Sequence, residues 1–133
     1  MKLSLADLGR VSFHDSALLS VEEHPGYIRM EIDVAYVWPS LIGAEEGDSW
    51  TLKECSLQCF DVQKNEKEEW DNTLSPKPSS NPSLPIDEIL DNEVKGTCLE
   101  LAGFTHNKNW GVWRIEAREY EFCWKQKEKF IKD

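Results

Sequence analysis

The chain has 133 residues, with 25 acidic and 15 basic side chains and a formal net charge of −10. A chain of this length folds around a single core, so we expect residues 1–133 to form one domain. A surface this acidic repels the phosphates of nucleic acids and of membrane lipids, which excludes both as expected partners and favours a basic protein.

The first ten residues, MKLSLADLGR, place Asp7, Gly9 and Arg10 where a signal peptide has an apolar run. No stretch approaches the roughly 18 apolar residues of a membrane-spanning helix. We therefore expect a cytoplasmic protein. Residues 4–10 have the pattern of a single helical turn, with Ser4 as its N-terminal cap.

Residues 11–38, VSFHDSALLSVEEHPGYIRMEIDVAYVW, are predicted to form two antiparallel strands. Pro25 and Gly26 match the second and third positions of a type II turn. Beyond the turn, apolar and polar residues alternate with the two-residue period of a half-buried strand. The apolar set is Ile28, Met30, Ile32 and Val34, and the polar set is Arg29, Glu31 and Asp33.

The middle of the chain is predicted as one strand between two polar connections. Residues 39–49 are rich in glycine and acids, which indicates an exposed connection. In residues 50–62 the apolar phase changes, which predicts a β-bulge near Lys53 and Glu54 or a strand covered on both faces. Residues 63–70, QKNEKEEW, are polar and are interpreted as a second solvated connection.

Residues 71–85 contain four of the six prolines, and proline removes donors from a β-ladder. This segment is therefore predicted to be a long surface loop, and we favour a mobile rather than a functional one. After it, Ile86, Ile89 and Leu90 share one face at helical spacing. The spacing predicts a helix of about two turns over residues 86–92.

The last third is predicted to be a β-hairpin, with strands over residues 94–105 and 112–125 joined by HNKNWG. The buried face changes between Ala117 and Tyr120, so we expect a bulge near Arg118 and Glu119 or a strand that crosses between layers. The predicted fold class is mainly β: an antiparallel sheet curled into a sandwich or open barrel, with one or two short helices.

The four cysteines, Cys55, Cys59, Cys98 and Cys123, fall in predicted strands. We interpret them as reduced thiols that pack in the core. Cys55 and Cys59 are about 13 Å apart along a regular strand, too far to share a tetrahedral metal without a bend. We expect neither a metal nor another cofactor.

The densest cluster of reactive side chains is Phe13, His14, Asp15 and Ser16. As an enzyme, it would offer a histidine base, a carboxylate and a hydroxyl nucleophile. Neighbours on a strand point to opposite faces, however, so His14 and Asp15 are not expected to form the hydrogen bond that a triad needs.

We favour a structural role for this cluster. Asp15 and Ser16 would accept backbone N–H bonds, and His14 would bond to a carbonyl. If Asp15 is buried in that role, Asp15→Ala costs about 1–3 kcal/mol. A small-ligand-binding protein or an enzyme centred on His14 and Asp15 is the alternative.

Residues 13–16, followed by the strand ALLSV, a short turn and an alternating strand, resemble the opening of a group of small bacterial proteins. This group includes immunity proteins encoded beside polymorphic toxins. The closing segment WRIEAREYEF, residues 113–122, is similar to the acidic strand that often ends those proteins. The resemblance implies a non-catalytic cytoplasmic protein that binds and neutralises a cognate toxin, with a basic nuclease as one candidate.

Acids in the two predicted connections are candidate contacts with such a toxin, because charge pairing accelerates association with a basic partner. An ordinary solvated surface is the alternative for each residue, and an interaction module that uses an exposed strand edge is a further alternative for the protein. The candidate contacts are Glu45, Glu46, Asp48, Glu66, Glu68 and Glu69.

Overall fold

The computed structural model describes residues 1–37, 50–71 and 76–129, which form one antiparallel sheet and one short helix. The prediction of a mainly β chain built on an antiparallel sheet is confirmed. In chain order the elements are β1 (Lys2–Leu3), α1 (Leu5–Leu8), β2 (Val11–Ser12), β3 (Ser16–His24), β4 (Tyr27–Val37), β5 (Trp50–Trp70), β6 (Pro76–Pro78), β7 (Glu88–Lys95), β8 (Cys98–Phe104), β9 (Trp110–Cys123) and β10 (Gln126–Lys129).

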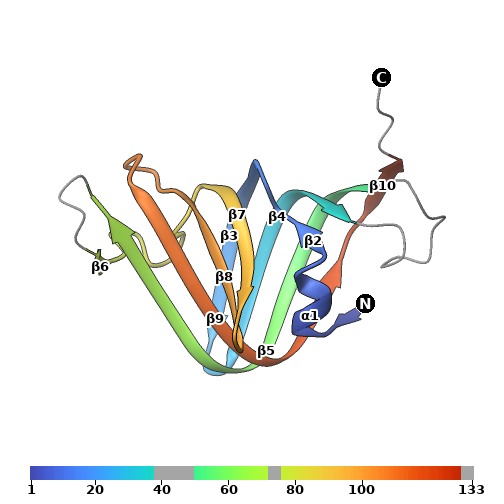
Figure 1. Cartoon of the computed structure of the whole chain (residues 1–133), viewed down its shortest axis with the longest axis horizontal. Helices are drawn as coiled ribbons and strands as arrows, with labels where there is room; N and C mark the ends of the chain where they lie inside the picture. The colour runs from blue at the N-terminus through green and yellow to red at the C-terminus, as the bar shows by residue number, and fades with distance from the viewer. Residues whose placement is uncertain (38–49, 72–75, 130–133) are drawn as a thin grey trace.

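Six of the strands pair in a ring, in the order β9, β8, β7, β3, β4, β5, and β5 pairs with β9 to close it. Figure 1 shows that β5 and β9 each cross the bottom of the V-shaped sheet and rise on both sides of it. The weakest join in the ring lies between β3 and β7. These strands pair only where Ser16 meets Ile89 and Ala17 meets Glu88.

The irregularities that accompany the two predicted changes of buried face both lie in β5. In β5, Asp61 has φ +54°, and the register with β9 shifts between Val62 and Lys64. The extra residue thus belongs to β5 and not to β9, so the bulge predicted near Arg118 and Glu119 is wrong and lies instead in the strand that pairs with them. Glu54, with φ +53°, lies where β10 replaces β9 as the neighbour of β5.

The predicted hairpin of β3 and β4 is confirmed. His24 pairs with Tyr27 across the turn, and Gly26 has φ +73°, which a type II turn requires at this position. The first three apolar residues of the alternating pattern are buried, but Val34 is not. Ala35 is buried in its place, because the face of β4 changes beside the irregularity at Glu54.

The prediction of a solvated connection over residues 63–70 is wrong, because β5 continues through Trp70. Its polar residues pair with β9 in opposite charges: Lys64 meets Glu116, and Glu66 meets Arg114. Cross-strand pairing with a distant segment therefore outweighs the weak strand propensity of this sequence.

The helix predicted over residues 86–92 is also wrong. Residues from Glu88 onward form β7, which pairs with β8 along its length. Ile86 and Ile89 are buried as expected, but they are buried by a strand arrangement rather than by a helical face. The strand predicted over residues 94–105 is divided between β7 and β8 by a turn at residues 96–97.

The proline-rich segment is only partly a surface loop. Residues 72–75 lie outside the described part of the chain, and β6 is a three-residue edge strand beside the end of β5. Pro85, the last residue of the segment, and Ile86, which follows it, are buried. Residues 79–87 therefore return the chain across one face of the sheet to the start of β7.

The N-terminal helical turn is confirmed. The hydroxyl of Ser4 accepts the N–H of Asp7, and the carboxylate of Asp7 accepts the N–H of Ser4. Leu8 of this turn is fully buried and joins a continuous core. The largest fully buried side chains of that core are Trp113, Phe13, Phe122, Leu8, Ile28, Met30, Ile32, Leu52, Leu57, Ile86, Ile89 and Leu99.

Gly103 in β8 should not tolerate a side chain. A Cβ there would lie 1.8 Å from the backbone oxygen of Glu88. We expect Gly103→Ala to destabilise the fold by about 3 kcal/mol or more, because the backbone of β7 must move. At Gly26 a Cβ meets nothing within 4 Å, so Gly26→Ala should cost only the strain of a positive φ, about 1–2 kcal/mol. Urea denaturation measures both, and equal losses would contradict the close approach at Gly103.

Candidate functional site

The predicted cluster, residues 13–16, forms the turn between β2 and β3. Phe13 is fully buried, with its ring centroid 6.0 Å from that of Phe122. Ser16 is also fully buried, and its hydroxyl donates a hydrogen bond to the Val34 carbonyl at 2.6 Å. These two side chains hold the turn against the core and against β4.

His14 and Asp15 lie between these anchors and are exposed. Asp15 has φ +60°, so the chain turns here instead of continuing as a strand. The turn brings Nε2 of His14 within 3.3 Å of Oδ2 of Asp15. The expectation that these neighbours cannot meet is therefore wrong, because it assumed strand geometry.

The proposed bracing role of Asp15 is wrong as well. Its side chain is 62% exposed, and its carboxylate pairs with His14 instead of accepting backbone N–H groups. The cost of about 1–3 kcal/mol predicted for Asp15→Ala assumed a buried Asp15, so it is no longer expected. Asp33, and not Asp15, accepts a backbone N–H at this turn: its Oδ1 accepts the N–H of Ala17 at 2.7 Å.

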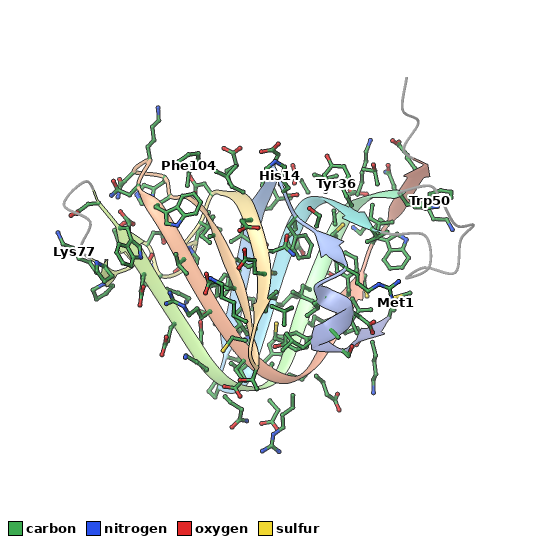
Figure 2. All side chains as sticks on the ribbon, viewed as in Figure 1. Met1, His14, Tyr36, Trp50, Lys77 and Phe104 are labelled. Atoms are coloured by element: carbon green, nitrogen blue, oxygen red, sulfur yellow. The ribbon has the colours of Figure 1, made fainter. Side chains whose placement is uncertain are left out.

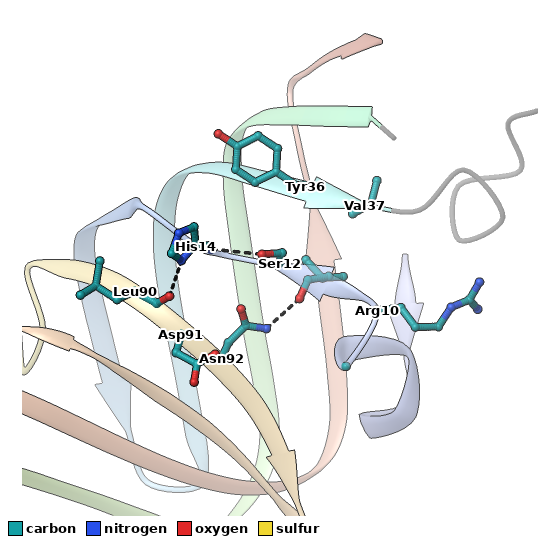
Figure 3. Close-up of a pocket in the computed structure, with 10 residues that line it drawn as sticks. Arg10, Ser12, His14, Tyr36, Val37, Leu90, Asp91 and Asn92 are labelled. Carbon is teal, nitrogen blue, oxygen red and sulfur yellow. Dashed lines mark hydrogen bonds between the residues drawn. The ribbon is translucent and has the colours of Figure 1, made fainter. Parts of the chain in front are cut away.

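The expected bond from His14 to a carbonyl is confirmed. Nδ1 of His14 lies 2.5 Å from the carbonyl oxygen of Leu90 in β7 (Figure 3). A carbonyl only accepts, so Nδ1 carries the proton and Nε2 faces Asp15. The bond to Leu90 and the charge of Asp15 raise the pKa of His14, and Asp91 and Glu88 add to the effect.

Asn92 of β7 bridges the gap between β7 and the segment before the turn. Its Oδ1 accepts the Phe13 N–H at 2.8 Å, and its Nδ2 donates to the Val11 carbonyl at 2.7 Å. The carboxamide offers one acceptor and two donors, so it replaces a strand's peptide group where no backbone ladder forms. Together with the bond from His14 to Leu90, it joins the two elements.

Beside this bridge lies a pocket of about 520 Å³. Figure 3 shows it between the end of β4 on one side and β7 on the other. Its polar side chains include Arg10, His14, Tyr36 and Asn92, and His14 is the group among them that titrates near neutral pH. The lining residues are Gly9, Arg10, Val11, Ser12, His14, Tyr36, Val37, Leu90, Asp91 and Asn92.

The structure brings together only some of the side chains that an enzyme centred on His14 and Asp15 would use. His14 lines the pocket and contacts Asp15, but the Ser16 hydroxyl is buried and bonded to Val34. The three side chains do not converge as a triad. Sequence reasoning missed Asn92, which it assigned to a helix, and Tyr36, whose exposure follows from the change of face in β4.

Three of the predicted contact acids, Glu45, Glu46 and Asp48, lie outside the described residues. The other three, Glu66, Glu68 and Glu69, belong to β5 rather than to a connection. Glu66 is exposed and lies 3.7 Å from the ammonium of Lys64. The second acidic connection therefore does not exist as a loop.

Glu68 and Glu69 are engaged inside the domain. Glu68 pairs with Arg114 at 3.1 Å. Glu69 is 7% exposed and accepts hydrogen bonds from Ser80 at 2.7 Å and Asn109 at 2.6 Å. Burial alone would raise the pKa of Glu69, but the hydrogen bonds from Asn109 and Ser80 outweigh it and lower the pKa. As a direct contact with a partner, Glu69 is poorly placed.

Two of the four free cysteines belong to the core, as predicted. Burial raises the pKa of Cys55 and of Cys59 to about 12, so both remain thiols at neutral pH. Cys98 is half-buried and Cys123 is exposed, so the core assignment is wrong for Cys123. Within residues 1–37, 50–71 and 76–129, no group of three or more histidine, cysteine or acidic side chains is arranged to hold a metal ion.

No protein-family model, curated protein or solved structure matches this chain. In the part of the chain that the structure describes, no helix has the length and apolar character needed to cross a membrane.

Removing the Asn92 bridge should destabilise the fold. Asn92→Ala leaves the Phe13 N–H and the Val11 carbonyl without partners, which should cost about 1–3 kcal/mol. Asn92→Asp keeps the acceptor for Phe13 and loses the donor to Val11, so its penalty should be smaller at pH 7. Urea denaturation tests this order, and two variants as stable as the wild type would show that the bridge carries no stability.

His14 should make stability depend on pH. Its pKa is raised above the ordinary value of 6.5, so the stabilisation is fully present below about pH 6.5 and is lost as pH rises through the folded-state pKa. We expect urea midpoints of the wild type to fall across this range and those of His14→Asn to show less of this fall. Asp15→Asn should lower the pKa of His14, which NMR titration of the His14 ring measures. An unchanged titration would contradict the contact.

Proposed function

We propose that this protein is a non-catalytic, cytoplasmic immunity-type protein that binds and neutralises a basic toxin. The observation that carries the proposal is an acidic rim around His14, formed by Asp15, Glu88 and Asp91. All three are near enough to raise the pKa of His14, and among the described residues none has a lysine or arginine within 4.0 Å.

An acidic rim that no lysine or arginine pairs with is a favourable surface for a basic protein. Exposed like charges repel one another, and a cationic partner relieves that repulsion while its approach is accelerated by long-range attraction. The net charge of −10 acts in the same direction over the whole surface. The resemblance of residues 13–16 and 113–122 to immunity-type proteins supplies the class of partner, a cognate toxin.

The bonding of the cluster supports a binding role over a catalytic one. Ser16 donates its hydroxyl proton to Val34, and Nδ1 of His14 is committed to Leu90. The groups that an enzyme would use for nucleophilic attack are thus used to hold β3 against β4 and β7.

A small-ligand-binding role is the second candidate. The pocket of about 520 Å³ beside His14 has a guanidinium, an imidazole, a phenol and a carboxamide on its walls, and convergent polar groups in a pocket of this size are typical of ligand sites. This second hypothesis predicts that a small molecule, rather than a protein, occupies the space next to His14 and Tyr36.

The proposal is tested by co-expression with the toxin encoded next to the gene. We expect the two proteins to co-purify and growth to be restored. The double variant Glu88→Gln with Asp91→Asn should bind the toxin about tenfold more slowly at low salt, measured by stopped-flow mixing. The matched control is Glu116→Gln with Glu119→Gln in β9, which removes two carboxylates away from the rim and should change the rate little. Failure of both co-purification and rescue would refute the proposal.

A further inference from the structure

Three aromatic side chains lie next to one another across strands β8, β9 and β5. Phe104 pairs with Trp110, and Trp110 pairs with Trp70. Directly paired residues of antiparallel strands project from the same face, and the rings of Phe104 and Trp110 meet edge to face with centroids 6.0 Å apart. We call these three residues the aromatic row.

The aromatic row is uncovered by any described residue over much of its surface. Phe104 is 43% exposed and Trp110 39% exposed, whereas Trp70 is half-buried. The opposite face of the same strands is covered, since a Cβ at Gly111 would lie 2.9 Å from the carbonyl oxygen of Pro85. The row therefore faces away from Pro85 and Ile86, toward the outside of the sheet.

Carboxylates flank the row at its Phe104 end. Glu88 pairs directly with Phe104 across β7 and β8. Asp87, Glu88 and Phe104 form walls of a pocket of about 370 Å³, which Thr105, His106 and Lys108 complete. Oδ1 of Asp87 is buried and accepts no hydrogen bond, so this carboxylate is short of donors. The pocket thus sets two carboxylates against one ammonium.

We propose that the aromatic row and this pocket form the docking surface for a basic segment of a protein partner. An arginine or lysine side chain of the partner sits between the ring of Phe104 and the carboxylates of Asp87 and Glu88. Trp110 and Trp70 pack on the residues beside that side chain. The inference rests on the proposed function, because it identifies the surface with which a basic toxin would be bound.

Two energetic terms favour this occupant. A guanidinium or ammonium over an aromatic face gains about 0.5–2 kcal/mol, more when water is excluded, and a carboxylate on the other side adds a charge-assisted hydrogen bond. Exposed tryptophan and phenylalanine supply contact area at little cost in side-chain entropy. Neither term alone selects a partner, but together they select a cationic side chain next to an apolar neighbour.

Strand addition is a poor alternative at this place. β8 lies between β7 and β9, and β9 lies between β8 and β5, so the backbone groups around the aromatic row are already paired. A partner must therefore bind to side chains at this place rather than pair with the backbone. Glu88 pairs with both Ala17 and Phe104, so the docking surface adjoins the acidic rim. Figure 2 shows Phe104 and His14 along the upper edge of the molecule in this view.

The test uses a capped peptide that contains two arginines, and its counterpart that contains two citrullines, which keep the shape of arginine without the charge. We expect the arginine peptide to give saturable shifts of the Trp110 indole N–H and of the Phe104 ring in NMR spectra. The citrulline peptide should bind about tenfold more weakly. Equal binding of the two peptides, or shifts confined to the pocket beside His14, would overturn the inference.

Substitutions in the docking surface test the same proposal. Phe104→Leu, which keeps an apolar side chain for folding, and Asp87→Asn with Glu88→Gln should each weaken the arginine peptide about tenfold. Glu116→Gln with Glu119→Gln should not. Lys108→Gln should tighten binding about threefold, because it removes a like charge from the pocket. Weaker binding by Lys108→Gln would show that the pocket accepts an anion, and would overturn the proposed occupant.

The toxin experiment separates the two proposals. If the neighbouring toxin binds with full affinity to Phe104→Leu and to Trp110→Ala, the docking surface is wrong and the proposed function stands. If the arginine peptide binds at the row but the toxin neither co-purifies nor is neutralised, the proposed function fails and the row remains a site for a different basic protein.

Discussion

The narrow join between β3 and β7 is the constraint on which the rest of the structure depends. Only two residue pairs connect these strands through the backbone. Beyond them, the Asn92 carboxamide and the bond from His14 to Leu90 replace the ladder. Because side chains extend the join beyond the two backbone pairs, the chain can turn at Asp15 without losing its contact with β7, and the turn leaves a pocket and an exposed imidazole.

Local signals explain what could be predicted from the sequence. The hairpin of β3 and β4 depends on two adjacent residues, Pro25 and Gly26, and on a strict alternation, so it could be predicted without knowledge of the partners. The cap of α1 is equally local, since Ser4 and Asp7 satisfy each other. The irregularity at Glu54 of β5 could be found because a change of buried face is itself a pattern in the sequence. The change of face in β9 was visible too, but the extra residue beside it belongs to β5.

Distant pairing explains what could not be predicted. The end of β5 is polar and has no strand pattern of its own, and it becomes a strand because β9 offers charges of opposite sign and the large ring of Trp113. The Trp113 Nε1 donates to the Asn65 side chain at 2.7 Å, and the Lys67 ammonium lies 5.5 Å from the centre of a Trp113 ring. The spacing of Ile86 and Ile89 likewise fits a helix or a strand, and only the neighbours β3 and β8 decide.

The candidate site likewise combines features that follow from local sequence with features that follow from distant pairing. That His14 would bond to a carbonyl was predictable from its side chain, but its contact with Asp15 depends on a positive φ at a residue that is not glycine. The exposure of Phe104 and Trp110 depends on register, because a shift of one residue would turn both rings to the covered face. Aromatic content alone did not distinguish these residues from the buried Trp113.

Glu88 connects the two surfaces to which we assign binding. It pairs with Ala17 of β3 on one side and with Phe104 of β8 on the other, so it lies between the His14 turn and the aromatic row. Protonation of His14 places a positive charge close to Asp15, Glu88 and Asp91 and reduces the attraction of the rim for a basic partner. The bond from His14 to Leu90, which lies beside the narrow join, also favours that protonated state. The contact between the His14 turn and β7 and the charge of the acidic rim therefore depend on the same imidazole.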